Sequence, residues 1–472
     1  MKIIGLHDGH NASAALLVDG RILSAIQEER LVGVKNKGGF PINAIKEVLA
    51  LNRLTLHDVD FIALAGYCND NYNSRDDVLN RYRIELEYEK TIRGKLRAAV
   101  RDNKVLRKVY SINTYKNNLE NRFKPLIDIG FDRNKIKLIE HHTSHAASAY
   151  YGYGKYDEPV LILTCDGAGD GLCATINIGQ KGQFERIASV PEGESIARIY
   201  AMMTYLMGMV PLEHEYKIMG LAPYAGNSKN VNRIFERFNS LFEFNPKKPL
   251  QWYRQKSVPA VFYLWETLEA IMHRERFDYI SAGLQVFIEH HMSQWVRNCI
   301  KETGIKKVAV AGGIFMNVKM NKVILELPEV DELFIFPSCG DETNAIGAAF
   351  YAYNQARINN KDLPSVSPLK GVYWGGEFAN SLAEEVLSIY TFKSKVTWEY
   401  IDDIERKIAE LLANGEVVAR AKGRMEFGAR ALGNRSILAG ADNIKSLRRI
   451  NDMIKCRDFW MPLPHQSWQK RA

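Results

Sequence analysis

Apolar runs and short polar turns alternate along the start of the chain. The segment HDGHNAS (7–13) separates a first and a second apolar run, and Asp19-Gly20 separates the second from a third. These three runs lie at 2–6, 14–18 and 21–27. An Asp-Gly pair between apolar runs is a strong signal for a two-residue hairpin turn. The sequence therefore predicts an antiparallel strand meander whose first turn is polar and contains glycine.

The same pattern returns near residue 159. The apolar run PVLILTC is followed by the glycine-rich turn DGAGDG (166–171), and then by the strand-like runs LCATINIG and FERIASV. We interpret the two segments as a duplicated half-domain of α/β class. Two such halves suggest the two-lobed fold of the actin/hexokinase/Hsp70 superfamily, in which both turns face a cleft and hold nucleotide phosphates. On pattern alone, two unrelated meanders are the alternative.

Outside these strands the pattern changes to helices and a linker. Residues 70–125 are polar with helical spacing and are interpreted as an insertion, whereas 256–302 are predicted to form long helices. Prolines, paired asparagines and little apolar pattern make 357–372 the best linker candidate. We therefore expect an internally duplicated domain at 1–360 and a second domain at 370–472.

Composition places the chain among ordinary folded proteins. It has 472 residues, of which 46% are hydrophobic and 25% charged, and its formal net charge is +8. The segment 98–124 is locally basic, and a solvated helical face is favoured there over a nucleic-acid patch. The six cysteines form no CxxC pair, which argues against a zinc ribbon and a disulfide scaffold. Without a signal-peptide pattern or a membrane-length apolar run, the protein is expected to be cytoplasmic.

Histidines provide the first candidates for chemistry. His141 and His145 are four residues apart, so on a helix they face the same way and can share a metal. A carboxylate from elsewhere would strengthen this hypothesis, and Asp341, in a turn before the small-residue helix AIGAA, is the candidate. By themselves the histidines fit an ordinary surface or core pair, and Asp341 fits a helix N-cap. His10, in the first turn, is a candidate general base or a solvent-exposed turn residue.

Glycine-rich turns are the second group of candidates. Backbone amides in the turn that begins at Asp166, and in the turn with Gly313 and Asn317, can approach phosphate closely. Plain tight turns would show the same pattern. In GRMEFGARALGNRSIL the arginines stand beside glycines, and Arg424 is the first of them. Such arginines favour phosphate binding, with a solvated basic face as the alternative, and Lys455 adds positive charge beyond them.

Taken together, these segments resemble the NodU/CmcH family of O-carbamoyltransferases, from Met1 to about Pro462. The motifs follow the family order. They are LHDGHNASAALLVDG, QEERL with GGFP, EHHTSHAASAY, EYKIMGLAPYA, AGGIFMNVKMN, DETNAIGAA and GRMEFGARALGNRSIL. The resemblance favours the two-lobed fold over unrelated meanders.

The resemblance implies a specific reaction. The larger domain is similar to an actin-like (ASKHA) domain with a bound metal, and the smaller one to a YrdC-like α/β domain. The YrdC-like domain of the family makes carbamoyl adenylate from carbamoyl phosphate and ATP. The actin-like domain then transfers the carbamoyl group to a hydroxyl of a sugar-type acceptor, such as a polysaccharide, a glycolipid or an antibiotic. No nucleic-acid partner and no membrane span are expected, and a homodimer is compatible with the family.

The resemblance also implies roles for individual residues. His10 matches the catalytic base. Iron(II), or manganese, matches a site formed by His141, His145 and Asp341. The remaining matches are Lys35, Thr164, Asp166, Gly313 and Asn317 for the nucleotide or carbamoyl adenylate, Asp278 for the acceptor, and Arg424 and Lys455 for ATP and carbamoyl phosphate.

The sequence departs from the family pattern in three places. Ala429 replaces a proline in the arginine-rich motif, and Thr343 stands where many members have glycine. After INDMIKCRDFWMP the chain turns to LPHQSWQKRA, so the YrdC-like domain is expected to be shortened. The alternative function is therefore a nucleotide- and metal-binding homologue with impaired catalysis. A sugar kinase or a tRNA-modifying subunit on the same fold is a further alternative. The arginine-rich segment argues against the sugar kinase.

Overall fold

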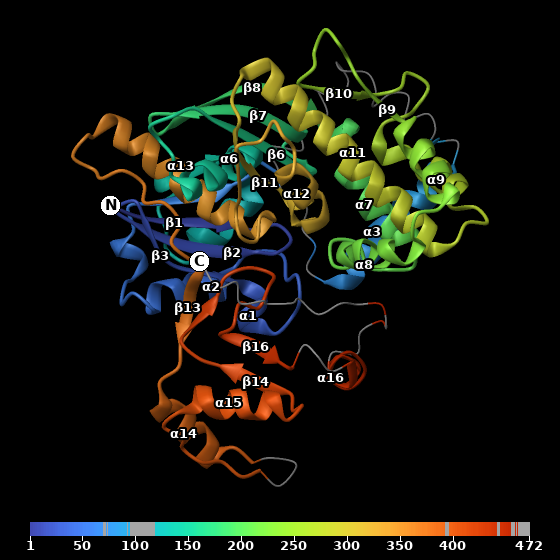
Figure 1. The fold of residues 1–472 in the computed structure, drawn as a ribbon. Helices are drawn as coiled ribbons and strands as arrows, with labels where there is room; N and C mark the ends of the chain where they lie inside the picture. Colours follow the sequence, from blue (N-terminus) through green and yellow to red (C-terminus); the bar gives the residue numbers. More distant parts are fainter. Residues whose placement is uncertain are drawn as a thin grey trace. The chain divides into compact units, whose positions relative to one another are not determined.

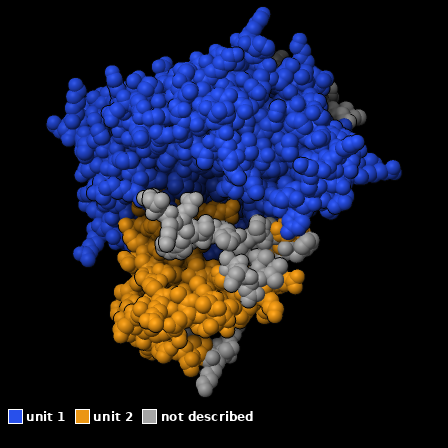
Figure 2. Space-filling model, in the orientation of Figure 1, with its two compact units in different colours: residues 1–372 blue, residues 373–472 orange. Residues whose placement is uncertain are grey.

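The computed structural model divides the chain into two compact units, residues Met1–Val372 and Tyr373–Ala472 (Figure 2). The residues that the structure describes are 1–68, 72, 74–91, 93–94, 119–391, 396–440, 444–454, 458 and 460. Lys455 therefore lies outside the described residues. Among those described, no helix is both long enough and apolar enough to cross a bilayer.

The first unit opens with a five-stranded mixed sheet, which we call the first lobe, in the order β3-β2-β1-β4-β5. The central strand β1 pairs antiparallel with β2 and parallel with β4. The strands are β1 (Lys2–His7), β2 (Ser13–Val18), β3 (Arg21–Gln27), β4 (Phe61–Ala65) and β5 (Ile136–Ile139). Asp19 and Gly20 have φ of 45° and 79°, as a type I′ hairpin requires. The predicted N-terminal meander is confirmed.

A second five-stranded sheet, the second lobe, repeats this plan in the order β12-β11-β6-β7-β8. Its central strand β6 pairs antiparallel with β7 and parallel with β11, as β1 does with its neighbours. The strands are β6 (Val160–Gly169), β7 (Leu172–Gln180), β8 (Gln183–Pro191), β11 (Lys307–Ala311) and β12 (Glu332–Ile335). The shared topology confirms the duplicated α/β fold of the actin/hexokinase/Hsp70 type and excludes two unrelated meanders.

Two helices, α6 (His141–Tyr153) and α13 (Asn344–Asn359), lie between the two sheets (Figure 1). Small residues let these elements approach closely. A Cβ on Gly347 would lie 1.8 Å from the carbonyl oxygen of Ser144, and one on Gly5 would lie 1.8 Å from that of Ala345. The small-residue segment AIGAA is therefore needed for packing, and it places the start of α13 beside the start of α6.

The second lobe also carries most of the remaining helices and a small hairpin. The predicted helical region 256–302 is observed as α10 and α11, whose core includes Trp265 and Trp295. The further elements of the first unit are α1 (Glu28–Val32), α2 (Ile42–Ala50), α3 (Arg75–Glu89), α7 (Ile196–Leu206), α8 (Glu215–Leu221), α9 (Lys229–Asn239), β9 (Phe242–Phe244), β10 (Trp252–Arg254), α10 (Trp265–Met272), α11 (Phe277–Thr303) and α12 (Val318–Leu325), with short 3₁₀ helices between them.

The basic segment 98–124 needs one correction. Its described part begins at residue 119 and lies in a helix over 119–128. Arg122 in this helix is only 4% exposed, so it does not belong to a solvated face. It is buried because its guanidinium finds a carboxylate and backbone carbonyls inside the protein.

The second unit is smaller and has two antiparallel strand pairs, β13 with β15 and β14 with β16. Its described elements are β13 (Tyr373–Glu377), α14 (Asn380–Ile389), α15 (Ile404–Ala413), β14 (Val418–Ala421), β15 (Arg424–Glu426), β16 (Arg435–Leu438), α16 (Ile444–Arg449) and a π-helical turn Ile450–Ile454. The amphipathic segment DIERKIAELLAN (403–414) forms α15, and the run EVVARA that follows its turn contains β14.

Candidate active site

Helix α6 presents two histidines from its first two turns. The helix begins at His141 because Glu140 caps it: the Glu140 carboxylate accepts from the backbone N–H of Thr143 at 2.7 Å. The i, i+4 spacing then brings the rings of His141 and His145 to 4.8 Å between centroids. Both residues are buried.

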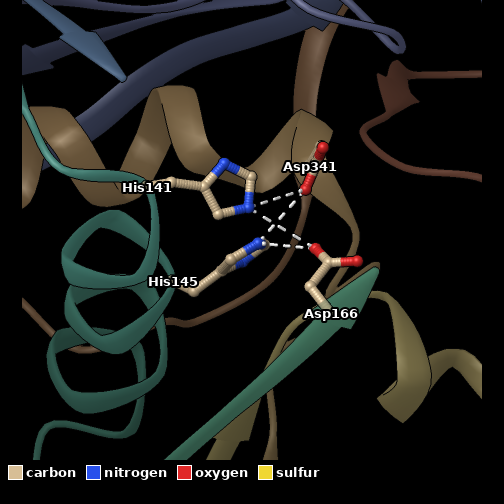
Figure 3. A group of neighbouring side chains, drawn as sticks. All are labelled: His141, His145, Asp166 and Asp341. Atoms are coloured by element: carbon tan, nitrogen blue, oxygen red, sulfur yellow. Dashed lines mark hydrogen bonds and ion pairs between the residues drawn. The ribbon is translucent and has the colours of Figure 1, made fainter. Parts of the chain in front are cut away.

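Two carboxylates from other elements complete the cluster (Figure 3). Asp166 lies near the end of β6, and Asp341 lies in the short turn before α13. Nε2 of His145 is 3.0 Å from Asp166 Oδ2 and 3.2 Å from Asp341 Oδ1. Nε2 of His141 is 3.6 Å and 3.4 Å from the same two oxygens. One donor atom from each of the four residues lies within 4.8 Å of the others.

The donor set fits a divalent metal ion. Two imidazole nitrogens and two carboxylate oxygens suit iron(II), manganese or zinc. Nε2 of His141 is buried and makes no hydrogen bond to any residue that the structure describes, although it faces both carboxylates. A cation between the carboxylates would give this atom a partner and offset their mutual repulsion.

The pKa values of the cluster follow from the same contacts. Burial opposes protonation of His141, but Asp341 and Asp166 outweigh it and raise the pKa of His141 to about 10. The pKa of His145 is also raised, because hydrogen bonds to Asp166 and Asp341 overcome burial. Burial alone would raise the pKa of Asp166, yet the two histidines hold it well below its usual range. The carboxylates are thus kept ionised, and a metal ion would take the place of the proton on His141 when it binds.

His10 faces the cluster from the first lobe. Its Nε2 lies 3.5 Å from Oδ2 of Asp341, the oxygen opposite the one that faces α6. Its side chain is 25% exposed, whereas that of His7 is 1% exposed. Nε2 of His7 is 3.0 Å from the carbonyl oxygen of His10, and burial lowers the pKa of His7 to about 4. His7 is therefore a neutral residue that shapes the turn, and His10 is the histidine accessible to a substrate.

The residues expected to contact a nucleotide lie in different surroundings. Gly313 adjoins the cluster, since a Cβ there would lie 2.9 Å from Oδ1 of Asp166. Thr164 is fully buried behind it, where its hydroxyl is 2.8 Å from Nδ1 of His142 and 2.6 Å from the hydroxyl of Thr175. The Thr164 side chain thus supports the site from inside the protein.

Asn317 begins α12 and lies in a network of amides. Its carboxamide exchanges two hydrogen bonds with Gln285, at 2.9 and 3.1 Å, and also caps α12 through the N–H of Met320. Gln285 lines a cavity of about 790 Å³. Its lining residues are Met219, Ala222, Pro223, Gly226, Asn227, Ser228, Lys229, Val231, Asn232, Ala282, Gln285, Val286, Glu289 and Lys319.

Lys35 and Asp278 have partners within the protein. Nζ of Lys35 is 3.1 Å from Glu213, which belongs to the segment before α8. Asp278 is buried near the start of α11, and Arg276 contacts both of its oxygens, at 2.7 and 3.0 Å. Neither residue contacts the cluster in the described contacts.

In the second unit the arginine-rich motif is tied to its own backbone. The Arg424 guanidinium donates to the carbonyls of Trp374 and Gly375, at 2.7 and 3.1 Å. Arg435 donates to carbonyls of the neighbouring strands and turns. Glu426 accepts three backbone N–H groups, two from the loop between β15 and β16 and one from the first residue of β16, at 2.8 to 3.0 Å. The motif therefore forms a preorganised loop, which its sequence pattern alone did not reveal.

Sequence reasoning missed one member of the cluster. It placed Asp166 beside a nucleotide, whereas the structure brings its carboxylate to His141 and His145. The available signal was its position: Asp166 directly follows the apolar run PVLILTC of the second meander, and Asp8 lies in the matching turn of the first. Arg122 and Asp170 lie in segments that the sequence singled out, but as a basic helical face and a phosphate-binding turn, not for the loops they hold.

Comparison with known proteins identifies the family of this chain. The family model "Carbamoyltransferase N-terminus" matches residues 2–350, and "Carbamoyltransferase C-terminus" matches residues 409–472. The nodulation protein NolNO of Sinorhizobium fredii is 29% identical over 457 residues, which are 96% of this chain and 62% of that protein. The 3'-hydroxymethylcephem-O-carbamoyltransferase of Streptomyces clavuligerus is 30% identical over 154 residues, which are 33% of this chain and 26% of that protein.

A solved structure of full-length HypF, in a phosphate- and nucleotide-bound form, is 15% identical, with a TM-score of 0.43 over 78% of this chain and 56% of that one. The two family models together match most of the chain, and the range matched by the first includes all four residues of the buried cluster. The chain belongs to the carbamoyltransferase family.

Proposed function

We propose that this protein is an ATP-dependent O-carbamoyltransferase. Water would cleave carbamoyl phosphate to carbamate and phosphate, and the carbamate oxygen would attack the α-phosphate of ATP to give carbamoyl adenylate and pyrophosphate. The carbamoyl group would then pass to a hydroxyl of a sugar-type acceptor. The observation that carries the proposal is the His141/His145/Asp166/Asp341 cluster with His10 beside it, in a chain that matches the carbamoyltransferase family.

The transfer step assigns a proton to His10. The acceptor oxygen attacks the carbamoyl carbon, its proton goes to Nε2 of His10, and the bond to the AMP phosphate breaks so that AMP leaves with the electron pair. Oδ2 of Asp341, 3.5 Å from that nitrogen, would stabilise the imidazolium that forms when Nε2 takes up the proton. A metal ion held by the four-residue cluster, iron(II) or manganese, would stabilise the negative charge that develops on the carbamoyl and phosphate oxygens.

Binding of the nucleotide is assigned to the second lobe. The cavity of about 790 Å³ beside Gln285 is within the size range of small-molecule sites. Asn317 and Gly313 connect this cavity to the cluster, because Asn317 bonds Gln285 and Gly313 adjoins Asp166. We assign the adenosine of carbamoyl adenylate to the cavity and its phosphate to the Gly313 turn.

The acceptor and the activation step rest on fewer observations. The name of the Streptomyces clavuligerus relative specifies a hydroxymethyl acceptor, which supports transfer to oxygen. Asp278, and Lys35 near the nucleotide, are assigned by their motif positions. In the second unit, the preorganised loop after Arg424, together with Lys455, is assigned to ATP and carbamoyl phosphate.

Mass spectrometry of the reaction products tests the proposal. Purified protein with ATP, carbamoyl phosphate and iron(II), without an acceptor, should form carbamoyl adenylate and pyrophosphate. Detection of ADP in place of these products would contradict the proposal. Synthetic carbamoyl adenylate with a panel of sugars should release AMP and give carbamoylated sugar.

His10→Asn isolates the transfer step. Since asparagine cannot take up the proton, transfer should be lost, while adenylate formation and manganese binding persist. His57→Asn, at an exposed position in the first lobe, is the matched control and should behave as the unmodified protein. Transfer by His10→Asn at the unmodified rate would show that another group is the base.

A further inference from the structure

The turn that supplies Asp166 also supplies an anchor. Asp170 lies four residues later, at φ of 52°, and its carboxylate accepts only backbone N–H groups in the described contacts. These are the N–H of His141 at 2.8 Å, of Tyr67 at 2.8 and 2.9 Å, and of Cys68 at 3.0 Å. One carboxylate of the second lobe thus holds both the start of α6 and the segment after β4.

Arg122 holds the other side of that segment. Its Nε and Nη2 contact the two oxygens of Asp8 at 2.8 and 2.7 Å. Its Nη1 donates to the carbonyl of Gly66 at 2.6 Å, and Nη2 also donates to that of Ala65 at 2.7 Å. Arg122 and Asp8 are 4% and 6% exposed, so the pair is buried and well satisfied.

The two anchors meet on residues 65–68. The carbonyls of this segment bind Arg122, and its N–H groups bind Asp170. Asp8 belongs to the turn that carries His10, and Asp170 holds the amide of the metal-ligating His141. A continuous chain of hydrogen bonds therefore runs from the catalytic turn to the helix with the metal ligands.

Resting on the proposed function, we propose that Arg122 and Asp170 are positioning residues that hold the His10 turn and α6 at a fixed separation. Arg122 also neutralises Asp8, so this buried carboxylate does not compete for the metal. The described end of the predicted 70–125 insertion thus has a role in the site, because it places Arg122 against Asp8 in the His10 turn. Positioning of this kind matters because a shift of about 1 Å can cost about 100-fold in rate.

The test uses conservative substitutions, because removing one member of a buried ion pair can unfold a protein. Arg122→Lys keeps the charge but loses the two-pronged contact with Asp8, and Asp170→Asn keeps the shape but loses the charge. Arg133→Lys and Asp132→Asn are matched controls on the surface: Arg133 is 49% exposed in its pair with Glu120, and Asp132 caps the next short helix.

Hydrogen–deuterium exchange of the full chain without metal is the first measurement, and it does not depend on activity. In Asp170→Asn, exchange at Tyr67, Cys68 and His141 should be faster. In Arg122→Lys, the turn at 7–11 should exchange faster, while both controls match the unmodified protein. Unchanged exchange at these sites, or an equal increase throughout the chain, would contradict the proposal.

Manganese affinity and transfer kinetics are the second measurement. Asp170→Asn should weaken Mn²⁺ binding by about 10-fold, as is typical when a partner behind a metal ligand is lost. Arg122→Lys should leave Mn²⁺ affinity unchanged but lower kcat for AMP release from carbamoyl adenylate, with KM unchanged. If Arg122→Lys shows the kcat of the unmodified protein, the proposed positioning role of Arg122 is wrong. If the unmodified protein releases no AMP, the proposed function fails, and exchange and Mn²⁺ affinity still decide whether the anchors exist.

Discussion

At the scale of single residues, the buried histidines show how neighbours decide chemistry. Carboxylates raise the pKa of His141 to about 10, whereas burial lowers the pKa of His7 to about 4. His291 resembles His7 in having a lowered pKa. It lies among aromatic rings, stacked on Phe244 at 4.6 Å between centroids, and burial lowers its pKa to about 3. The same side chain is thus a candidate metal ligand, a neutral turn residue or part of the core.

His291 should make the fold sensitive to acid. Because its folded pKa of about 3 lies below the ordinary histidine value of 6.5, stability should fall as the pH falls below 6.5. Protonation of His291 in the unfolded chain alone lowers the free energy of unfolding by up to about 1.4 kcal/mol for each pH unit below 6.5. In His291→Phe, urea unfolding between pH 7 and 5 should depend less on pH, whereas exposed His57→Gln should not change the slope. An unchanged slope in His291→Phe would mean that His291 is solvated in the folded protein.

At the scale of elements, the site depends on how the DGAGDG turn packs beneath α6. Gly169 adjoins the ring of His141 so closely that a Cβ there would lie 2.2 Å from it. Gly167, in the same turn, has nothing within 4 Å of its Cβ position. The two glycines look equivalent in the sequence, but only Gly169 is required for the His141 ring to reach the carboxylates.

Gly169→Ala should therefore displace His141 and impair the cluster. We expect weaker Mn²⁺ binding and a free energy of unfolding lower by about 1–3 kcal/mol, as overpacking usually costs. Gly167→Ala should bind Mn²⁺ normally. Isothermal titration and urea unfolding of both variants check this, and equal behaviour of the two would show that the ring of His141 can move aside freely.

At the scale of the whole molecule, the cluster belongs to one compact unit. All four of its residues lie within Met1–Val372. His141 and His145 come from α6, which follows the last strand of the first lobe, whereas Asp166 lies in β6 of the second lobe and Asp341 in the turn between β12 and α13. A metal bound there would connect the two halves of the duplicated domain. Its four candidate ligands include no residue of Tyr373–Ala472.

Calorimetry should show this difference. Mn²⁺ at 100 times its Kd stabilises the state that binds it by about 2.7 kcal/mol, which for a unit of this size corresponds to a rise in Tm of about 3 °C. The rise should occur in the transition of the first unit alone and be absent in Asp166→Ala. A Mn²⁺-induced shift that survives in Asp166→Ala would place the binding site elsewhere.

The sequence by itself determined the local elements of this protein and much of its chemistry. Alternating apolar runs and the Asp-Gly turn predicted the strand meanders, because hairpin geometry depends on neighbouring residues. The spacing of His141 and His145 predicted a shared face, because the helical period is local. The family motifs placed these residues, with His10 and Asp341, in one site.

Tertiary structure decided what local pattern cannot encode. Asp166 joins the two histidines of α6 only because β6 passes beside that helix, and Thr164 is buried only because His142 and Thr175 cover it. Arg122 looked like part of a basic surface until its partners, more than 50 residues away along the chain, were in place. Contacts between distant segments depend on how the two lobes pack, and a period or a motif within one segment carries no information about that packing.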